Sequence, residues 1–281
     1  MASPPVLSPS GTTGFNRQSW MDGFEEPTYQ KTVFIDSIQV YPGRLMNVGN
    51  VRKEARVSAT VLAQDADGDG LTPVNPSGTP VTITPVGRFV QVEWSANEKA
   101  QVEVDLNAAL ARNIEKALAE AMDSAGLSNA TSLTQNISQA SIDSTMWRRA
   151  VGLGMQNTNG QYMPGDWKAV FSPTQYPNIM AIDEFTHADV RGDSENPTVK
   201  GIFTKGGGVN VRFSTVVTQD ANGWHNPLYV ESAFIIGWNT RPQAFSEQTE
   251  LLFRINTFAN MGVSILHDLR AIDLRLTASA L

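Results

Sequence analysis

The chain has 281 residues, of which 41% are hydrophobic and 17% are charged, and this composition is typical of a folded protein rather than a disordered one. A net charge of -7 argues against a protein whose main task is to grip a nucleic-acid backbone. The absence of cysteine excludes disulfides, zinc–thiolate sites and cysteine nucleophiles. The first residues lack the pattern of a secretory signal peptide, and no run of about 18 apolar residues predicts a membrane span.

Residues 1 to about 30 are rich in proline, serine, glycine and threonine and show no helical or strand periodicity, which predicts an extended arm. A solvated tail has little use for large aromatic side chains, so we expect the arm to bury its aromatic residues on a neighbouring subunit. These residues are Phe15, Trp20, Phe24 and Tyr29. A disordered tail is the simpler alternative. A strand-like run at residues 33–35 and a turn at residues 41–43 follow.

Apolar side chains alternate from residue 57 to 63 and again from 81 to 94, which predicts two strands of a long β-hairpin. The connection at 65–80 is too long for a tight turn and is expected to be an exposed, irregular tip. Four basic residues lie at the base of this hairpin: Arg52, Lys53, Arg56 and Arg88. Solvated surface charge stabilises little, but these charges could instead meet acidic patches on a neighbouring subunit and fix its register.

The hairpin tip contains the sequence QDADGDGL, which resembles the first half of an EF-hand calcium loop. Asp65, Asp67 and Asp69 stand at the first three ligand positions. The bidentate glutamate that completes such a loop is replaced by Pro76, and no helices are predicted on either side. A turn-forming acidic tip that contacts a neighbouring subunit is therefore the favoured interpretation. We predict no metal site and no cofactor.

The strongest helical pattern lies between residues 103 and 125. Its narrow apolar stripe, with one residue at every fourth position, predicts a helix that packs on one side against a sheet. The stripe consists of Leu106, Leu110, Ile114, Leu118 and Met122. Gly126 suits the C-terminal end of this helix. Residues 127–144 are small and polar, which predicts a linker or surface loop.

Short helical and strand patterns mix from residue 145 to about 240, which predicts a compact α+β or α/β domain. The expected elements are a buried strand at 167–173, a short helix at 175–184, and strands at 209–217 and 232–237. Between residues 250 and 277 the two-residue alternation returns in three runs, with a turn at residues 260–262 between the first two. These runs predict a closing β-meander.

No set of residues in the sequence predicts an enzyme. There is no nucleophile elbow, and the three histidines, His187, His225 and His267, do not have the spacing of metal ligands. The glycines at 152–154 do not form a dinucleotide fingerprint, and the run at 205–208 is a flexible turn rather than a phosphate loop.

The order of these elements resembles the Hong Kong 97 (HK97) type major capsid protein of tailed double-stranded-DNA bacteriophages. The resemblance extends over about residues 50 to 277. It rests on VTITPVGRFVQVEWS (81–95), the helix that follows, WKAVFSPTQYPNIMAI (167–182), GGVNV (207–211), AFIIGWNTRP (233–242) and LLFRINTFANMGVSILHDLRAIDLRL (251–276).

The resemblance implies an α+β, HK97-like fold with four parts. These are an N-terminal arm at 1–49, an extended β-hairpin loop at 50–95, a peripheral domain with a long spine helix and a β-sheet at 96–126 and 241–281, and a mixed α/β axial domain at 127–240. It also implies a structural, non-enzymatic protein whose hexamers and pentamers form an icosahedral head around double-stranded DNA. The protein would assemble in the host cytoplasm and reside in the virion.

The partners that this resemblance implies are other copies of the chain, a portal, a decoration protein and packaged DNA that is held by proximity, with no membrane. The arm is too short to include a scaffolding segment, so we expect a separate scaffolding protein. The expected contacts between subunits are Trp20, Phe24, Arg52, Lys53, Arg56, Asp65, Asp67, Asp69 and Arg88. Some relatives crosslink a lysine of the hairpin tip to a neighbouring asparagine, but residues 65–80 contain no lysine. Alternatives are an encapsulin-like compartment with the same fold and a calcium-dependent binding module.

Overall fold

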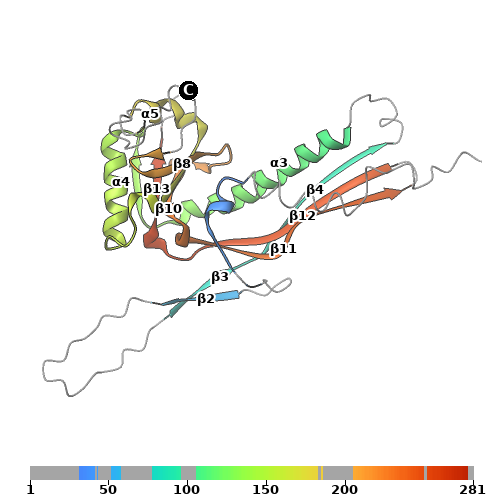
Figure 1. Cartoon of the computed structure of the whole chain (residues 1–281), viewed down its shortest axis with the longest axis horizontal. Coiled ribbons are helices and arrows are strands. Elements are labelled where there is room, and N and C mark those ends of the chain that lie inside the picture. The colour runs from blue at the N-terminus through green and yellow to red at the C-terminus, as the bar shows by residue number, and fades with distance from the viewer. Residues whose placement is uncertain are drawn as a thin grey trace, which may run out of the picture.

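A computed structural model describes residues 32–41, 43, 52–57, 78–95, 106–182, 185, 205–249 and 252–277. These residues form two β-sheets with flanking helices and a separate two-stranded hairpin. Figure 1 shows a compact lobe around the larger sheet, an elongated part in which one long helix lies along the smaller sheet, and the hairpin that projects away from both. No helix in this described part is long and apolar enough to cross a membrane.

The larger sheet has seven strands in the order β5-β13-β10-β6-β8-β7, with β9 paired to β10. Strands β10 and β13 are buried along almost their whole length, as expected where both faces of a sheet are covered. The strands are β5 (Asn136–Gln139), β6 (Trp167–Phe171), β7 (Lys205–Gly206), β8 (Val209–Phe213), β9 (Gln219–Asp220), β10 (Gly223–Val230) and β13 (Ala271–Leu276). Strand β6 confirms the buried strand expected at residues 167–173.

Helix α4 (Ser144–Asn157) packs on one face of this sheet. It begins at Asp143, whose carboxylate accepts the backbone N–H of Met146 at 2.7 Å, so that one N-terminal donor of the helix is satisfied. A Cβ at Gly154 would lie 2.5 Å from the ring of Trp167, so a residue without a side chain lets helix and strand approach. The short helix α5 (Tyr176–Met180) lies within the helical segment expected at 175–184.

The smaller sheet has the strand order β1-β11-β12-β4, and helix α3 (Leu106–Leu127) covers one of its faces. Its strands are β1 (Gln39–Val40), β4 (Val86–Ser95), β11 (Phe234–Thr249) and β12 (Leu252–Ile265). Ile114, Leu118 and Met122 of the expected helical stripe are buried against this sheet, which confirms the helix and its packing face. The same core includes Tyr229 of β10 and Val170 of β6, so one face of the larger sheet packs on the elongated part, while α4 and the other face form a separate core.

The expected long hairpin is only partly correct. Strand β2 (Arg52–Val57) pairs antiparallel with β3 (Gly78–Ile83). Strand β4, however, pairs along its length with β12, not with β2. The reason is that Val90 and Val92 pack against the core beneath α3, which binds β4 to the smaller sheet.

The expected closing meander is wrong. Strand β12 continues without a turn through residues 260–262, and β13 belongs to the larger sheet. Gly262, which resembled a turn glycine, lies in a strand beneath a crossing segment of the chain. A Cβ at this position would lie 2.5 Å from the carbonyl oxygen of Thr84. The glycine therefore permits close approach between two backbones rather than a change of direction.

Three further expectations are corrected by local packing. Residues 33–35 do not form a strand, because the chain turns there into the 3-10 turn η2 (Ile35–Ser37). The segment 127–144 is not a surface linker, because it contains strand β5 and buries several apolar side chains. Those side chains are Ala130, Leu133, Ile137 and Ile142. Gly126 does not end helix α3, which continues to Leu127.

Five more 3-10 turns connect the described elements. They are η3 (Ser128–Ser132), η4 (Pro164–Asp166), η5 (Pro173–Gln175), η6 (Glu231–Ala233) and η7 (Asp268–Arg270). Turn η6 occupies the beginning of the strand that was expected at 232–237, and β11 starts directly after it.

Candidate assembly surface

The residues expected to contact other subunits do not all fall within the described part of the chain. Trp20, Phe24 and the three aspartates Asp65, Asp67 and Asp69 lie outside it. Arg52, Lys53 and Arg56 lie on β2 of the projecting hairpin, whereas Arg88 lies on β4 of the smaller sheet, opposite Ala259 of β12. The four basic residues therefore belong to two different structural units.

The β2–β3 hairpin is joined to the body at one end, as Figure 1 shows. There, the side chain of Ile83 is 0% exposed and packs against Ile235 of β11, with Tyr41 and Leu266 beside it. An isolated two-stranded hairpin is marginally stable in water, and its free edges are available for pairing. A hairpin that extends from the body in this way is suited to contact a second molecule.

An exposed aromatic group lies on the face of the smaller sheet that points away from α3, which we call the outer face. Phe89 of β4 is 81% exposed, more than any other large hydrophobic side chain of the described residues. It stands opposite Phe258 of β12, and the ring of Phe258 contacts that of Phe245 edge to face at 6.0 Å. Aromatic residues are more frequent at protein–protein interfaces than on the rest of the protein surface, and large exposed apolar patches are rare on monomers. The group therefore indicates a contact site.

The alternation of residues in this strand already contains one signal for this surface. Val90 and Val92 were assigned to one face of a strand, and Phe89 beside them therefore had to point the other way. What the alternation could not show is whether another element of the same chain covers the second face. The structure shows that Phe89 remains exposed there.

Strand β4 is also the edge of the smaller sheet, and it is ten residues long. Long edge strands present unpaired backbone groups, and proteins commonly protect them with charged side chains. Here Glu93 of β4 forms an ion pair with Arg254 of β12, and both side chains are partly exposed. This pair and the aromatic group lie on the same outer face, since Glu93 is four positions after Phe89 and alternate residues of a strand share a face.

The segment where the N-terminal part of the chain joins the body is held by a buried carboxylate. Asp123 of α3 is 3% exposed and accepts the backbone N–H groups of Val33, Phe34 and Ile35 at 2.6, 3.0 and 3.0 Å. Burial raises the pKa of Asp123, and the three N–H donors oppose this effect. The bonds explain why a segment with strand-like composition turns instead.

Two basic side chains of the larger sheet hold the same segment from the other side. Arg212 of β8 forms an ion pair with Asp36 at 2.7 Å and donates to the carbonyl of Val33, and Lys168 of β6 donates to the carbonyl of Ser37 at 2.8 Å. Burial raises the pKa of Asp36, against the effect of the Arg212 guanidinium. These contacts fix the position at which the N-terminal segment leaves the body.

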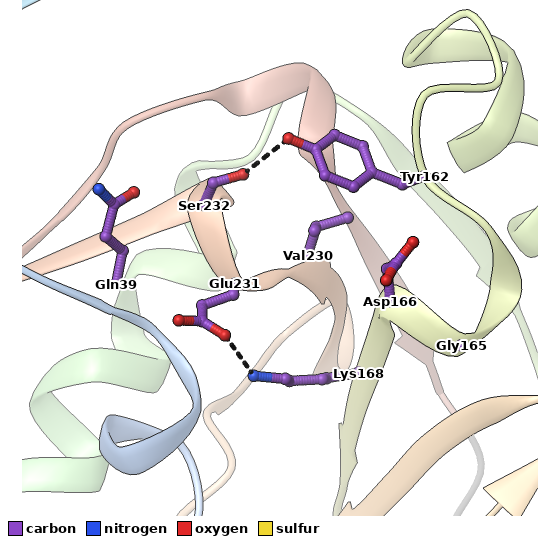
Figure 2. A pocket seen from close by; sticks show the side chains of 8 residues that line it. All are labelled: Gln39, Tyr162, Gly165, Asp166, Lys168, Val230, Glu231 and Ser232. Carbon is purple, nitrogen blue, oxygen red and sulfur yellow. Dashed lines mark hydrogen bonds and ion pairs between the residues drawn. The ribbon is translucent and has the colours of Figure 1, made fainter.

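A cavity of about 400 Å³, with several polar and charged residues in its lining, opens beside Lys168 between strands β1, β6 and β10. In Figure 2, Lys168 reaches Glu231 and the hydroxyl of Tyr162 points to Ser232, at 3.2 and 3.3 Å. The carboxylate of Asp166 accepts the backbone N–H of Met163 at 2.9 Å. These groups satisfy one another and do not form a nucleophile–base pair, so the cavity gives no support to an enzymatic function.

His225 lies in a buried charged cluster of the larger sheet. Its Nδ1 is 2.8 Å from Asp273 of β13 and its Nε2 is 3.0 Å from Asp220 of β9. Arg275 also donates to Asp273, at 2.7 Å. The cluster joins three neighbouring strands, and no group of the described residues has the composition and geometry of a metal site. We interpret it as a structural crosslink.

Neither a family model nor a curated protein matches this sequence. Solved structures do match, over most of their length. The capsid of cyanophage P-SCSP1u gives a TM-score of 0.67 at 14% identity, covering 88% of this chain and 89% of that one. The mature capsid of bacteriophage PhiM1 gives 0.65 at 10% identity, covering 88% and 87%. A virus-like particle from Pyrococcus furiosus gives 0.57 at 12% identity, covering 94% and 100%.

The chain has the fold of these capsid proteins. The match covers nearly nine-tenths of each chain, so it is not confined to one sheet or one helix. It confirms the α+β, HK97-like architecture that the order of elements predicted. Identities of 10 to 15% show that similar folds arise here from very different sequences.

Proposed function

We propose that the chain is a major capsid protein that assembles with copies of itself into hexamers and pentamers of an icosahedral phage head. The observation that supports this most directly is the capsid fold over almost the whole chain. The exposed surfaces agree with it, since a shell subunit must bury area on several neighbours. Stable interfaces bury about 1,600 Å² in total, and a projecting hairpin together with an open aromatic sheet face provides suitable area.

The expected contact residues take definite places in this proposal. Arg52, Lys53 and Arg56 would present positive charge from the hairpin to acidic patches on the next subunit, and Arg88 would act separately from the sheet. Trp20 and Phe24 of the arm, and Asp65, Asp67 and Asp69 at the hairpin tip, would add contacts farther from the body. A net charge of -7 suits a wall that encloses double-stranded DNA without binding it tightly.

The four-part division of the chain is part of the same proposal. The arm at 1–49, the loop at 50–95, the peripheral parts at 96–126 and 241–281 and the axial domain at 127–240 follow the order of elements. Pairing of β4 with β12 favours moving residues 86–95 to the peripheral domain, and the place of β13 in the larger sheet favours moving 271–276 to the axial domain. Both changes follow the hydrogen-bonded pairing.

The remaining partners follow from assembly of a phage head. A separate scaffolding protein, a portal and a decoration protein would act on the shell, with assembly in the host cytoplasm and a final place in the virion. Expression of the chain alone tests the scaffold. We expect irregular or few particles without one, and uniform closed shells from the chain alone would show that no scaffold is required.

An encapsulin-like compartment is the second candidate, because a virus-like particle from Pyrococcus furiosus has the same fold. Negative-stain microscopy combined with a nucleic-acid assay of particles from the native source separates the two. Shells that contain double-stranded DNA support the phage head, and shells filled with protein support the compartment. If the native source contains no shells of this protein, both candidate functions are contradicted.

A calcium-dependent binding module is the weakest alternative, since only the acidic tip suggests it. Titration calorimetry of the full chain with calcium decides this alternative. We expect no binding at millimolar calcium, because the position of the strongest ligand is occupied by Pro76.

A further inference from the structure

A groove lies between helix α3 and the loop after β8, at the point where the N-terminal segment meets the body. Its volume is about 530 Å³. Apolar side chains from four different segments form much of its lining: Val33, Ala119, Pro173, Phe213 and Val216. Contact between this apolar lining and water is unfavourable, because apolar surface is more stable against other apolar groups. An apolar side chain in the groove would therefore stabilise the folded chain.

The groove and the N-terminal segment are joined by the same residues. Val33 is part of the groove wall, and Asp123, which holds the backbone of Val33 at 2.6 Å, lines the groove as well. Thr32, the preceding residue, is buried. The segment before Thr32 is therefore attached close to the groove, because consecutive Cα atoms are about 3.8 Å apart.

We propose that the segment just before Thr32, residues 27–31, occupies this groove in its own chain, with the ring of Tyr29 against the apolar lining. Tyr29 is four residues from Val33, so at most about 13 Å of extended chain separates it from this residue of the groove wall. A tyrosine suits such a site, since its ring can be buried while its hydroxyl stays at the wet rim.

If Tyr29 occupies this groove, the arm would contact two surfaces, one on its own chain and one on a neighbouring subunit. Tyr29 would be bound in the same chain, and the more distant Trp20 and Phe24 would remain available for a neighbour. The inference does not depend on shell formation, because the groove and the segment belong to one subunit. It can therefore be tested on unassembled protein, and it can fail while the proposed capsid function stands.

The chain contains no cysteine, which makes thiol chemistry a clean probe. Thr215 lines the groove and is exposed in the described structure, so the variant Thr215→Cys reports access to it. We expect its alkylation by a maleimide to be at least about tenfold faster in Thr215→Cys/Tyr29→Ala than in Thr215→Cys alone, because burial of an aromatic side chain should keep the groove closed. Phe15→Ala, a matched change elsewhere in the arm, should leave the rate unchanged.

A second thiol, introduced by Leu269→Cys, controls for loss of folding. Leu269 is 53% exposed and does not line the groove, so Tyr29→Ala should not alter the alkylation rate of a thiol at this position. If Tyr29→Ala raises the alkylation rates of the thiols at positions 215 and 269 equally, the substitution destabilises the whole fold. That result would contradict the proposal. An unchanged rate for the groove thiol at position 215 would contradict it as well.

Mild oxidation of the double variant Thr28→Cys/Thr215→Cys decides between the same chain and a neighbour. This variant retains Tyr29, and a disulfide forms only when the two Cβ atoms come within about 4.5 Å. We expect an intramolecular disulfide, seen in denaturing gels without reductant as a band that migrates faster than the reduced monomer, because the closed loop makes the unfolded chain more compact. Covalent dimers would show that the groove holds the segment of a second copy, and no crosslink would show that the segment lies elsewhere; either result overturns the proposal.

Discussion

Asp123 shows how one carboxylate can determine the path of a chain segment. Three consecutive backbone N–H groups point to it from residues 33–35, and no strand partner is needed to satisfy them. The hydroxyl of Ser37 and that of Tyr229 then meet at 2.5 Å, and the ring of Phe34 packs edge to face on both Tyr229 and Phe234. One polar residue of a helix thereby fixes an apolar cluster around the N-terminal segment.

Asp123→Asn should lower the free energy of unfolding by about 1–3 kcal/mol at neutral pH, because the amide nitrogen would face the N–H of Val33 and leave that donor unsatisfied. It should also remove a pH dependence. The folded pKa of Asp123 lies above its ordinary value of 3.8, so the folded state binds this proton more tightly than the unfolded chain. The proton-linked part of its contribution to stability is therefore complete at low pH and is lost as the pH rises through the folded pKa, whereas the hydrogen bonds to residues 33–35 also act at neutral pH.

Asp143→Asn is the matched control, because asparagine is as good an N-cap as aspartate. The hydrogen bond from Met146 lowers the pKa of Asp143, so its contribution has the opposite sign and is lost as the pH falls below 3.8. Denaturant unfolding of both variants between about pH 3 and pH 7 measures the two slopes. Identical slopes in the Asp123→Asn variant and the unaltered chain would contradict the assigned role.

Substitution by alanine at two helical glycines should change the stability of the protein in opposite directions. A Cβ at Gly126 would lie 2.6 Å from the ring of Phe34, whereas a Cβ at Gly152 would have nothing within 4 Å. Gly126→Ala should therefore destabilise the protein by about 1–3 kcal/mol through overpacking. Gly152→Ala should stabilise it by about 0.5–1 kcal/mol through helix propensity. Thermal unfolding of both variants provides the test, and a stable Gly126→Ala protein would show that Phe34 can move aside.

At the scale of the elements, the periodicity of the sequence predicted what depends on local contacts. The stripe of α3 is correct because its apolar residues recur at every fourth position, and strand β6 is correct because it is a short, mostly apolar run that ends before Pro173. Helix α3 ends at Leu127, one residue beyond Gly126. The glycine leaves space for the ring of Phe34, which is far away in the sequence, rather than ending the helix. The turn expected at residues 260–262 is wrong for the same reason, because Gly262 makes space for the backbone of Thr84, which is also far away in the sequence. The partner of a strand is equally non-local, which is why β4 was assigned to the hairpin.

The outer sheet face is the element-scale feature with the clearest consequence. Phe89→Thr keeps β propensity and removes an exposed ring, so the melting temperature of the unassembled subunit should change little. If the face contacts another copy, loss of a buried phenylalanine weakens each contact by about 1.5–3 kcal/mol. The protein concentration at which particles form should then rise at least about tenfold, as measured by light scattering.

Gln91→Thr supplies the control for this change. Gln91 is exposed on the same strand, two residues from Phe89 and therefore on the same face. It should leave the assembly threshold unaltered, because it removes no apolar ring. Equal thresholds for Phe89→Thr and the unaltered chain would show that the outer face is not a subunit contact.

For the whole molecule, one core cluster contains side chains of both sheets, while a second lies within the lobe. In the described residues the hairpin packs on the body through Ile83 at its base. This distribution of packing suits a subunit with a rigid body and one extended element that reaches a neighbour. It also means that the strength of any assembly must come from contacts between chains. One possible covalent contact, a lysine–asparagine bond at the end of the hairpin, can be examined in the sequence.

Particles of this protein should dissociate completely to single chains when boiled in SDS. A lysine–asparagine crosslink requires a lysine amine at the hairpin tip, and residues 65–80 contain Asp65, Asp67 and Asp69 but no lysine. Introducing Thr72→Lys gives the informative comparison, because it supplies an amine without removing an aspartate. A ladder of bands above the monomer in the unaltered protein would show that a different lysine forms a covalent bond between subunits. A ladder in Thr72→Lys alone would show that the tip already lies beside an acceptor on the neighbouring subunit and lacks only the amine.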